Sequence, residues 1–167
     1  AAGERVAGVV TDPSAAAVSF DAATGQASGT AERVLGATAD GLLLLPAGKA
    51  GDTWILVDAR ADGVHVEPLA ATDFSRPLAK VTLTAAPAVV LEAGNRVANL
   101  VVTVLAAEAA GVARWALDTA VEYAKVREQF GKPIGSFQAI KHLCAEMLCR
   151  ADQAAVAASD VARAASD

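Results

Sequence analysis

The chain has few of the residues that build a disulfide scaffold or a nucleic-acid surface. Of its 167 residues only two are cysteines, aromatic residues make up 4%, and the formal net charge is −5. Cys144 and Cys149 fall in one expected helix, where their side chains point to different sides, so a disulfide between them is not expected. We therefore expect a reducing, cytoplasmic setting. The acidic balance argues against a nucleic-acid or anionic-membrane partner.

Long uncharged apolar runs and the common catalytic motifs are also missing. No window approaches an uncharged apolar run long enough to span a bilayer, and Glu4 and Arg5 argue against a signal peptide. The sequence has no metal-ligand spacing, no glycine-rich phosphate loop and no Ser-His-acid or Cys-His set. Hydrophobic residues nevertheless make up 54% of the chain. That is enough to bury a core in one ordinary domain or two small ones.

Two regions with different patterns follow one another, and together they predict an α+β chain. Residues 1–88 contain short apolar or alternating runs separated by turns rich in Asp and Gly, which predicts an antiparallel β-barrel or sandwich. Residues 89–167 are rich in alanine and predict a long antiparallel helical hairpin, with helices at about 91–130 and 136–167. Pro87 marks the expected boundary. The expected strands contain 6–10, 17–20, 42–45, 53–57, 64–67 and 79–83.

The faces of the two expected helices differ in character. Arg114, Asp118, Glu122 and Lys125 fall on one narrow stripe that we expect to be solvated. The run 100–105 carries no charge on any face, which indicates burial within a larger assembly, although its β-branched residues also leave a strand open. A second apolar seam, on the later helix, comprises Phe137, Ile140, Cys144, Met147, Leu148 and Ala151.

The connection between the helices carries the most particular pattern in the sequence. Gly131 is expected to end the first helix in a left-handed conformation, and Pro133 prevents the helix from resuming. Ser136 is expected to cap the second helix. Into this short connection the sequence places a cation, carboxamides and aromatic rings, a set suited to a flat, polar and anionic ligand. The residues are Arg127, Gln129, Phe130, Phe137 and Gln138.

This connection resembles the helix-turn-helix motif of the acyl-CoA dehydrogenase family, which carries an Arg-x-x-Phe-Gly…Phe-Gln pattern there. The resemblance continues over nearly the whole chain, as the family's middle β-domain and the first helices of its C-terminal domain. The family's N-terminal helical domain and late C-terminal helices are not expected within it. Further matching positions are Gly3-Glu4, Thr11-Asp12-Pro13, Gly111, Ala116-Leu117-Asp118, Tyr123 and Ala145-Glu146-Met147.

The resemblance implies α,β-dehydrogenation of an acyl-CoA thioester with FAD, and electron transfer onward to an electron-transfer flavoprotein. It also implies a homo- or hetero-oligomer in which Arg127 pairs with the FAD pyrophosphate of a neighbouring chain. Gln129, Phe130 and Gln138 would then contact the adenosine end, and the Thr11 hydroxyl the flavin ring. Each residue has a plainer interpretation: Arg127 in an ion pair with Glu128, the amides on the surface, the phenylalanines in the core, and Thr11 at a strand end.

Departures from the family pattern keep other functions open. Ser14–Ala17 replaces a Gly-Ser-Asp-containing segment, and Val34-Leu35-Gly36 supplies no hydroxyl where the family places one beside the flavin. No catalytic base is found, because Val101 occupies one family position for it and Glu92 and Glu108 are out of register. The chain is therefore interpreted as a dehydrogenase that is inactive alone, with two alternatives. One is a non-catalytic partner subunit that completes a neighbour's FAD site, and the other is a related flavin monooxygenase.

Overall fold

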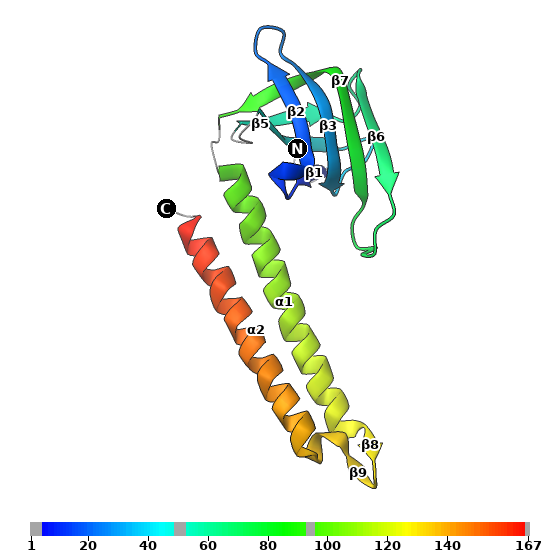
Figure 1. Cartoon of the computed structure of the whole chain (residues 1–167), viewed down its shortest axis with the longest axis vertical. Coiled ribbons are helices and arrows are strands. Elements are labelled where there is room, and N and C mark those ends of the chain that lie inside the picture. Colours follow the sequence, from blue (N-terminus) through cyan, green and yellow to red (C-terminus); the bar gives the residue numbers. More distant parts are fainter. Residues whose placement is uncertain (1–4, 49–52, 93–95, 166–167) are drawn as a thin grey trace. The chain divides into compact units, whose positions relative to one another are not determined.

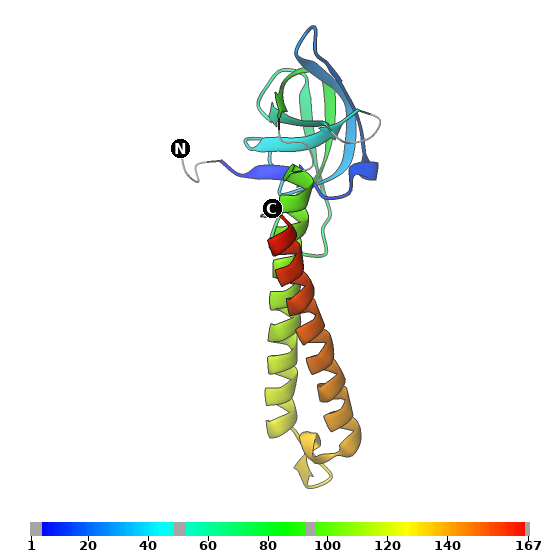
Figure 2. The same cartoon turned by 90° about the vertical axis from the view of Figure 1, so that its left-hand side faces the viewer.

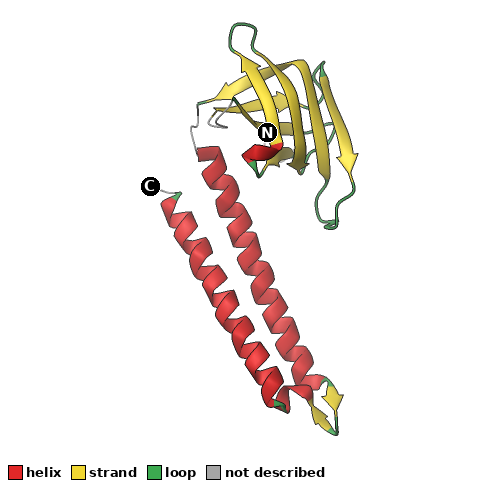
Figure 3. Cartoon of the chain, in the orientation of Figure 1, coloured by secondary structure: helices red, strands yellow, loops and turns green. Residues whose placement is uncertain are grey.

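The computed structural model describes residues 5–48, 53–92 and 96–165. The chain divides into two compact units, Ala1–Val97 and Ala98–Asp167. The first unit contains strands and the second two long helices (Figure 3), so the predicted α+β class is confirmed. The two units are described one at a time below.

The first unit is a closed β-barrel with two flanking strands. Its hydrogen-bonded neighbours run in the order β2-β3-β1-β4-β5-β7-β6, and β3 also pairs with β7. Strands β3, β1, β4, β5 and β7 therefore form a ring that curls around a common interior (Figures 1 and 2). The strands are β1 Ala7–Val10, β2 Ala16–Asp21, β3 Gln26–Leu35, β4 Leu42–Ala47, β5 Thr53–Asp58, β6 Val64–Leu69 and β7 Leu78–Leu91.

The barrel interior is filled by alternate residues of the strands, as a period of two requires. Leu43 and Leu45 of β4 and Ile55 and Val57 of β5 are fully buried, and β7 contributes Val81. Across the described part of the chain, no polar or charged side chain is buried. The expected antiparallel arrangement holds except between β1 and β4, which are parallel, with Ala7 opposite Leu42. A closed ring of five strands cannot alternate in direction all the way round, so one neighbouring pair has to be parallel.

Strand β7 corrects the predicted boundary between the two regions. Pro87 lies inside β7, opposite Gln26 of β3, and the strand continues to Leu91. A β-bulge precedes the proline: Ala85 has a φ of 50°, and its N–H donates to the Ser28 hydroxyl at 2.9 Å. Bulges are among the few places where a strand accepts proline. The first helix accordingly begins at Arg96 and not at Leu91.

The second unit consists of α1, Arg96–Val126, and α2, Gln138–Ala164, which run side by side in opposite directions (Figures 1 and 2). Leu117, Ala124 and Ala151 are the residues buried in these helices. An ion pair joins Arg114 of α1 to Asp152 of α2, with 3.0 Å between nitrogen and oxygen. The run 100–105 is helical, so the alternative of a strand there is wrong.

The outer faces of α1 are exposed in this unit. The charged stripe of Arg114, Asp118, Glu122 and Lys125 is exposed, as predicted. Leu100 and Val104 are exposed too, at 51% and 64%, so the pair of helices does not cover the apolar run. By length and composition α1 could also cross a membrane, with a mean hydropathy of 1.6 over its most apolar window. The uncharged part of α1 ends at Ala107, before Glu108, and a helix inside a helical bundle has the same composition.

Candidate functional site

The connection between α1 and α2 is a small β-hairpin and not a simple break between helices. Strand β8, Glu128–Gln129, pairs with β9, Lys132–Pro133. Phe130 and Gly131 form the two-residue loop, and both have positive φ values, 56° and 74°. Two successive left-handed residues are the requirement of a tight hairpin turn. Gly131 therefore shapes this turn, whereas α1 ends earlier, at Val126, and the prediction of a helix to Phe130 is wrong.

Backbone hydrogen bonds close the base of the hairpin. The Arg127 N–H donates to the Tyr123 carbonyl at 2.9 Å, and the Ile134 N–H donates to the Arg127 carbonyl at 2.8 Å. A short 3-10 helix, Ile134–Ser136, follows, and α2 then begins at Gln138. Ser136 lies within that short helix, so Phe137 occupies the N-cap position and provides no side-chain hydrogen bond. The predicted Ser136 cap is wrong for this reason.

Two aromatic rings and a lysine lie together on the hairpin. The Phe130 and Phe137 ring centroids are 6.1 Å apart, and the ring planes meet at 85°. The Lys132 ammonium lies 4.4 Å from the Phe137 ring centroid. Phe137 is half-buried, but Phe130 is 91% exposed. Phe130 is therefore not the core residue of the plainer interpretation, and its ring is available to a ligand.

The polar residues of the predicted site are exposed on the same connection. Arg127 and Gln129 enter the hairpin and Gln138 begins α2, and all three are exposed. Within the described part of the chain, no ion pair joins Arg127 to Glu128, so the guanidinium is not committed to that neighbour. The hairpin thus gathers a free cation, amides and an exposed ring, a donor set that suits a nucleotide with a pyrophosphate.

Thr11 lies in the other unit, on the segment that leaves β1. It is exposed and precedes Asp12, which caps the short helix Pro13–Ala15. The Ser14 hydroxyl and Ser14 N–H donate to the Asp12 carboxylate at 2.7 and 3.0 Å and hold the pKa of Asp12 below its usual value. This carboxylate therefore stays ionised beside Thr11 at neutral pH.

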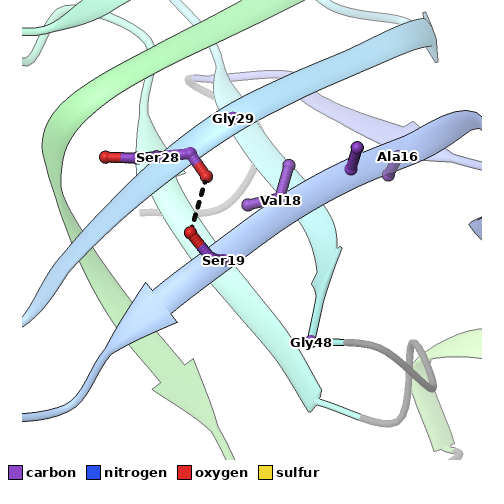
Figure 4. Close-up of a pocket in the computed structure, with 7 residues that line it drawn as sticks. Ala16, Val18, Ser19, Ser28, Gly29 and Gly48 are labelled. Carbon is purple, nitrogen blue, oxygen red and sulfur yellow. Dashed lines mark hydrogen bonds between the residues drawn. The ribbon is translucent and has the colours of Figure 1, made fainter.

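The positions expected to hold the flavin ring in the barrel offer little to a polar ring system. Val34 is fully buried in the barrel core, and Leu35 pairs with Val9 and Leu78. A shallow cavity of about 540 Å³ lies over β2 and β3 (Figure 4), but its lining contains no charged side chain. There the Ser19 hydroxyl already donates to the Ser28 carbonyl at 3.1 Å. Among the described residues, those of the hairpin offer side chains that suit FAD, whereas Val34 and Leu35 of the barrel offer a flavin ring no side-chain hydrogen-bond partner.

Neither a metal site nor a catalytic base is found in the described residues. No group of three His, Cys, Asp or Glu side chains that could hold a metal ion occurs in the ranges 5–48, 53–92 and 96–165. Val101 lies on α1 where one family position for the base was expected, and Glu108 lies exposed two turns later. The residue that sequence reasoning missed is Lys132. Its position between Gly131 and Pro133, five residues before an aromatic ring, was the available signal.

Comparisons with known proteins agree on one family. Residues 99–167 match the family model described as acyl-CoA dehydrogenase, C-terminal domain. The whole chain is 65% identical to acyl-CoA dehydrogenase FadE34 of Mycobacterium tuberculosis, over 168 aligned residues and 23% of that protein. The chain therefore spans about a quarter of this curated relative.

Several solved structures have a similar fold. A variant of the Tcur3481-Tcur3483 steroid ACAD matches 97% of this chain and 43% of that chain, at 33% identity and a TM-score of 0.77. The ChsE4-ChsE5 complex from Mycobacterium tuberculosis matches all of this chain and 45% of that chain, at 27% identity and a TM-score of 0.70. In both cases this chain corresponds to less than half of the matching chain.

Proposed function

Because this chain belongs to the acyl-CoA dehydrogenase family, we propose that it serves the α,β-dehydrogenation of an acyl-CoA thioester with FAD. The observation that carries the proposal is the exposed hairpin on which Arg127, Gln129 and Phe130 stand together. When bound, FAD would accept the hydride that leaves the β-carbon of the substrate. An electron-transfer flavoprotein is the proposed onward acceptor, and a reducing compartment suits the two free thiols of Cys144 and Cys149.

The hairpin residues have separate roles in this proposal. The Arg127 guanidinium binds the pyrophosphate, because a planar fork of donors suits phosphate oxygens. The carboxamides of Gln129 and Gln138 hydrogen-bond the adenosine end, and the exposed Phe130 ring offers a face or edge to the flat base. Because all four residues are exposed within the helical unit, we propose that the FAD they bind belongs to a neighbouring chain in an oligomer.

A second function is favoured by the barrel. Thr11 is exposed, but Val34 and Leu35 provide no hydroxyl at the positions expected beside the flavin ring. The segment described here would then act as the non-catalytic partner of a related chain, completing that chain's FAD site. Two of the similar solved structures are named as pairs of proteins, Tcur3481-Tcur3483 and ChsE4-ChsE5. The ratio of FAD to barrel units in the assembled protein distinguishes the two functions: one FAD per barrel supports the first, and fewer supports the second.

The substitution Arg127→Ala tests FAD binding by the hairpin. Removing a charge-assisted contact with the pyrophosphate should weaken FAD binding by roughly ten- to a hundred-fold. The assembled protein would be titrated with FAD, and the flavin retained after gel filtration would be measured by absorbance.

Arg150→Ala provides the matched control. Arg150 is an exposed arginine of α2 whose guanidinium donates to Glu146 at 2.5 Å, and its loss should leave FAD retention unchanged. Equal FAD affinity of the wild type and the Arg127→Ala variant would overturn the proposed function of the hairpin.

A further inference from the structure

Lys132 has a defined place in the hairpin although it belongs to none of the groups that would recognise the cofactor. It pairs with Gln129 across the two short strands. Its ammonium lies 4.4 Å from the centroid of the Phe137 ring. A cation at this distance from an aromatic face is attracted by the negative face of the ring. Lys132 therefore holds the second strand of the hairpin against the residue that precedes α2.

The Phe137 ring also contacts the ring of Phe130. The two rings meet edge to face, with centroids 6.1 Å apart and planes at 85°, an arrangement that aromatic pairs prefer. Lys132, Phe137 and Phe130 thus form a continuous row of contacts, which we call the hairpin stack. Its first member is charged, its middle member is half-buried, and its last member, Phe130, is 91% exposed.

The backbone of Phe130 indicates that the hairpin stack fixes the direction of this ring. Phe130 has a φ of 56°, in the left-handed region that bulky residues rarely adopt. Tight hairpin loops ordinarily place Asn, Asp or Gly at this position. Strained conformations persist where the surrounding contacts determine them, and they cluster at ligand sites. The contact with Phe137 is such a determining contact, and it leaves most of the Phe130 ring facing solvent.

We propose that Lys132 is a positioning residue: through Phe137 it orders the hairpin before ligand arrives and presents Phe130 as a preformed surface for the adenine of FAD. The inference rests on the proposed function, because it takes FAD as the ligand of the hairpin. A preformed surface spares the ligand the cost of ordering the loop on binding. Lys132 therefore affects FAD affinity without touching the cofactor.

The test measures the hairpin without ligand and FAD affinity separately, in the full chain. Amide hydrogen exchange at Ile134, whose N–H closes the base of the hairpin, reports its order in the absence of FAD. Calorimetric titration with FAD reports affinity. Lys132→Met keeps most of the aliphatic stem and removes the charge, so exchange should quicken and affinity fall by about two- to five-fold. Lys132→Arg should restore both to within about two-fold, since arginine also binds aromatic faces.

Two further variants complete the experiment. Phe137→Leu should match Lys132→Met in both measurements. The double variant should bind FAD no less tightly than the single variant with the lower affinity, because both changes interrupt one chain of contacts. Lys141→Met, on the exposed first turn of α2, removes an equal charge nearby and should change neither measurement.

Two results would overturn the role of Lys132. One is a loss of FAD affinity with unchanged exchange at Ile134, since Lys132 would then act by touching the cofactor. The other is additive losses in the double variant. If the wild type bound no FAD, the proposed function would fail instead, and the exchange at Ile134 would still decide whether Lys132 orders the hairpin.

Discussion

At the scale of single residues, Arg5 fastens the segment before β1 to the barrel. Its Nη1 and Nη2 groups donate to the two Asp58 carboxylate oxygens at 2.7 and 2.5 Å. Its Nε and Nη2 groups also donate to the carbonyls of Asp40 and Gly41, at 3.0 and 2.6 Å. The hydrogen bonds from Arg5, and next from the Arg60 N–H, hold the pKa of Asp58 well below its usual range.

The Arg5–Asp58 pair makes the stability of the barrel depend on pH, and the direction of that dependence follows from the lowered pKa of Asp58. Because the pKa of Asp58 is lower in the folded state, its stabilising contribution is fully present above the unfolded carboxyl value of about 3.9. It is lost as the pH falls through the folded-state pKa. Asp58→Asn should therefore lower the thermal midpoint of the barrel at pH 7, and the gap to the wild type should narrow toward about pH 3.

Thermal unfolding followed by circular dichroism, at several pH values between these limits, measures both effects. Asp62→Asn is the control, because Asp62 is an exposed carboxylate on the turn that follows Asp58. An Asp58→Asn midpoint that fell with acid as steeply as that of the wild type would contradict the assignment. The role of Arg5 was not predictable from sequence, because 53 positions separate it from Asp58 and no local pattern links the two.

At the scale of elements, local patterns predicted the strands that read as short apolar or alternating runs, but not β3. The start of β3 reads Gln-Ala-Ser-Gly-Thr, which carries no clear period of two. Its local ladder with β2 and its ladders with β1 and β7 make it a strand. The ladders with β1 and β7 involve residues far away in sequence. Similarly, Pro87 was interpreted as a boundary because only the tertiary structure places a bulge before it.

The position of the connection between the helices was predicted, but its β-hairpin conformation was not. The residues from Arg127 to Gln138 were predicted from local residue types, and four of the five predicted site residues lie there. Thr11 lies in the barrel unit and stays a prediction, as does the role of each of these residues in binding. A helix stop and a tight hairpin both use Gly131 in a left-handed conformation, so the sequence could not distinguish them.

The contact between α1 and α2 depends on few side chains, so a single truncation should weaken it measurably. Leu117 is 4% exposed, and shortening a buried leucine costs about 2–5 kcal/mol. We expect Leu117→Ala to lie near the lower end of that range, because a seam between two helices relaxes more easily than a closed core. Denaturant unfolding followed by the helical circular dichroism signal provides the measurement.

Leu143→Ala is the matched control for this truncation. Leu143 lies on α2 and is 56% exposed, so its loss should change the unfolding free energy by less than about 0.5 kcal/mol. Equal destabilisation by the two variants would mean that Leu117 does not hold the helices together.

At the scale of the whole molecule, the helical unit leaves several large apolar side chains of α1 exposed on one side of the helix. Val104, Trp115 and Val126 are 64%, 69% and 73% exposed. At 100° per residue they fall on the side of the helix away from Leu117 and Ala124. Apolar patches of this kind mark contact sites in folded proteins, and their exposure to water is unfavourable by about 25 cal/mol per Å². We therefore expect this surface to be covered in the assembled protein.

A charge placed on that surface should break the assembly. Val104→Glu is expected to lower the mass measured by light scattering at micromolar concentration and to release bound FAD, because a buried unpaired carboxylate is costly. Asp118→Asn, on the exposed charged stripe, should change neither property. A wild-type protein that is stable as a monomer, or an unchanged assembly of the Val104→Glu variant, would show that α1 does not form the contact.

Strand β7 determines when the barrel can close during synthesis. It is the last of the seven barrel strands in sequence, and β3, β5 and β6 all pair with it. Its Pro87 meets Gln26 from about 60 residues earlier, and such distant pairings form slowly. Until Leu78–Leu91 leaves the ribosome, those three strands keep open edges that invite pairing with other nascent chains. The barrel segment is thus most open to wrong pairing immediately before β7 emerges.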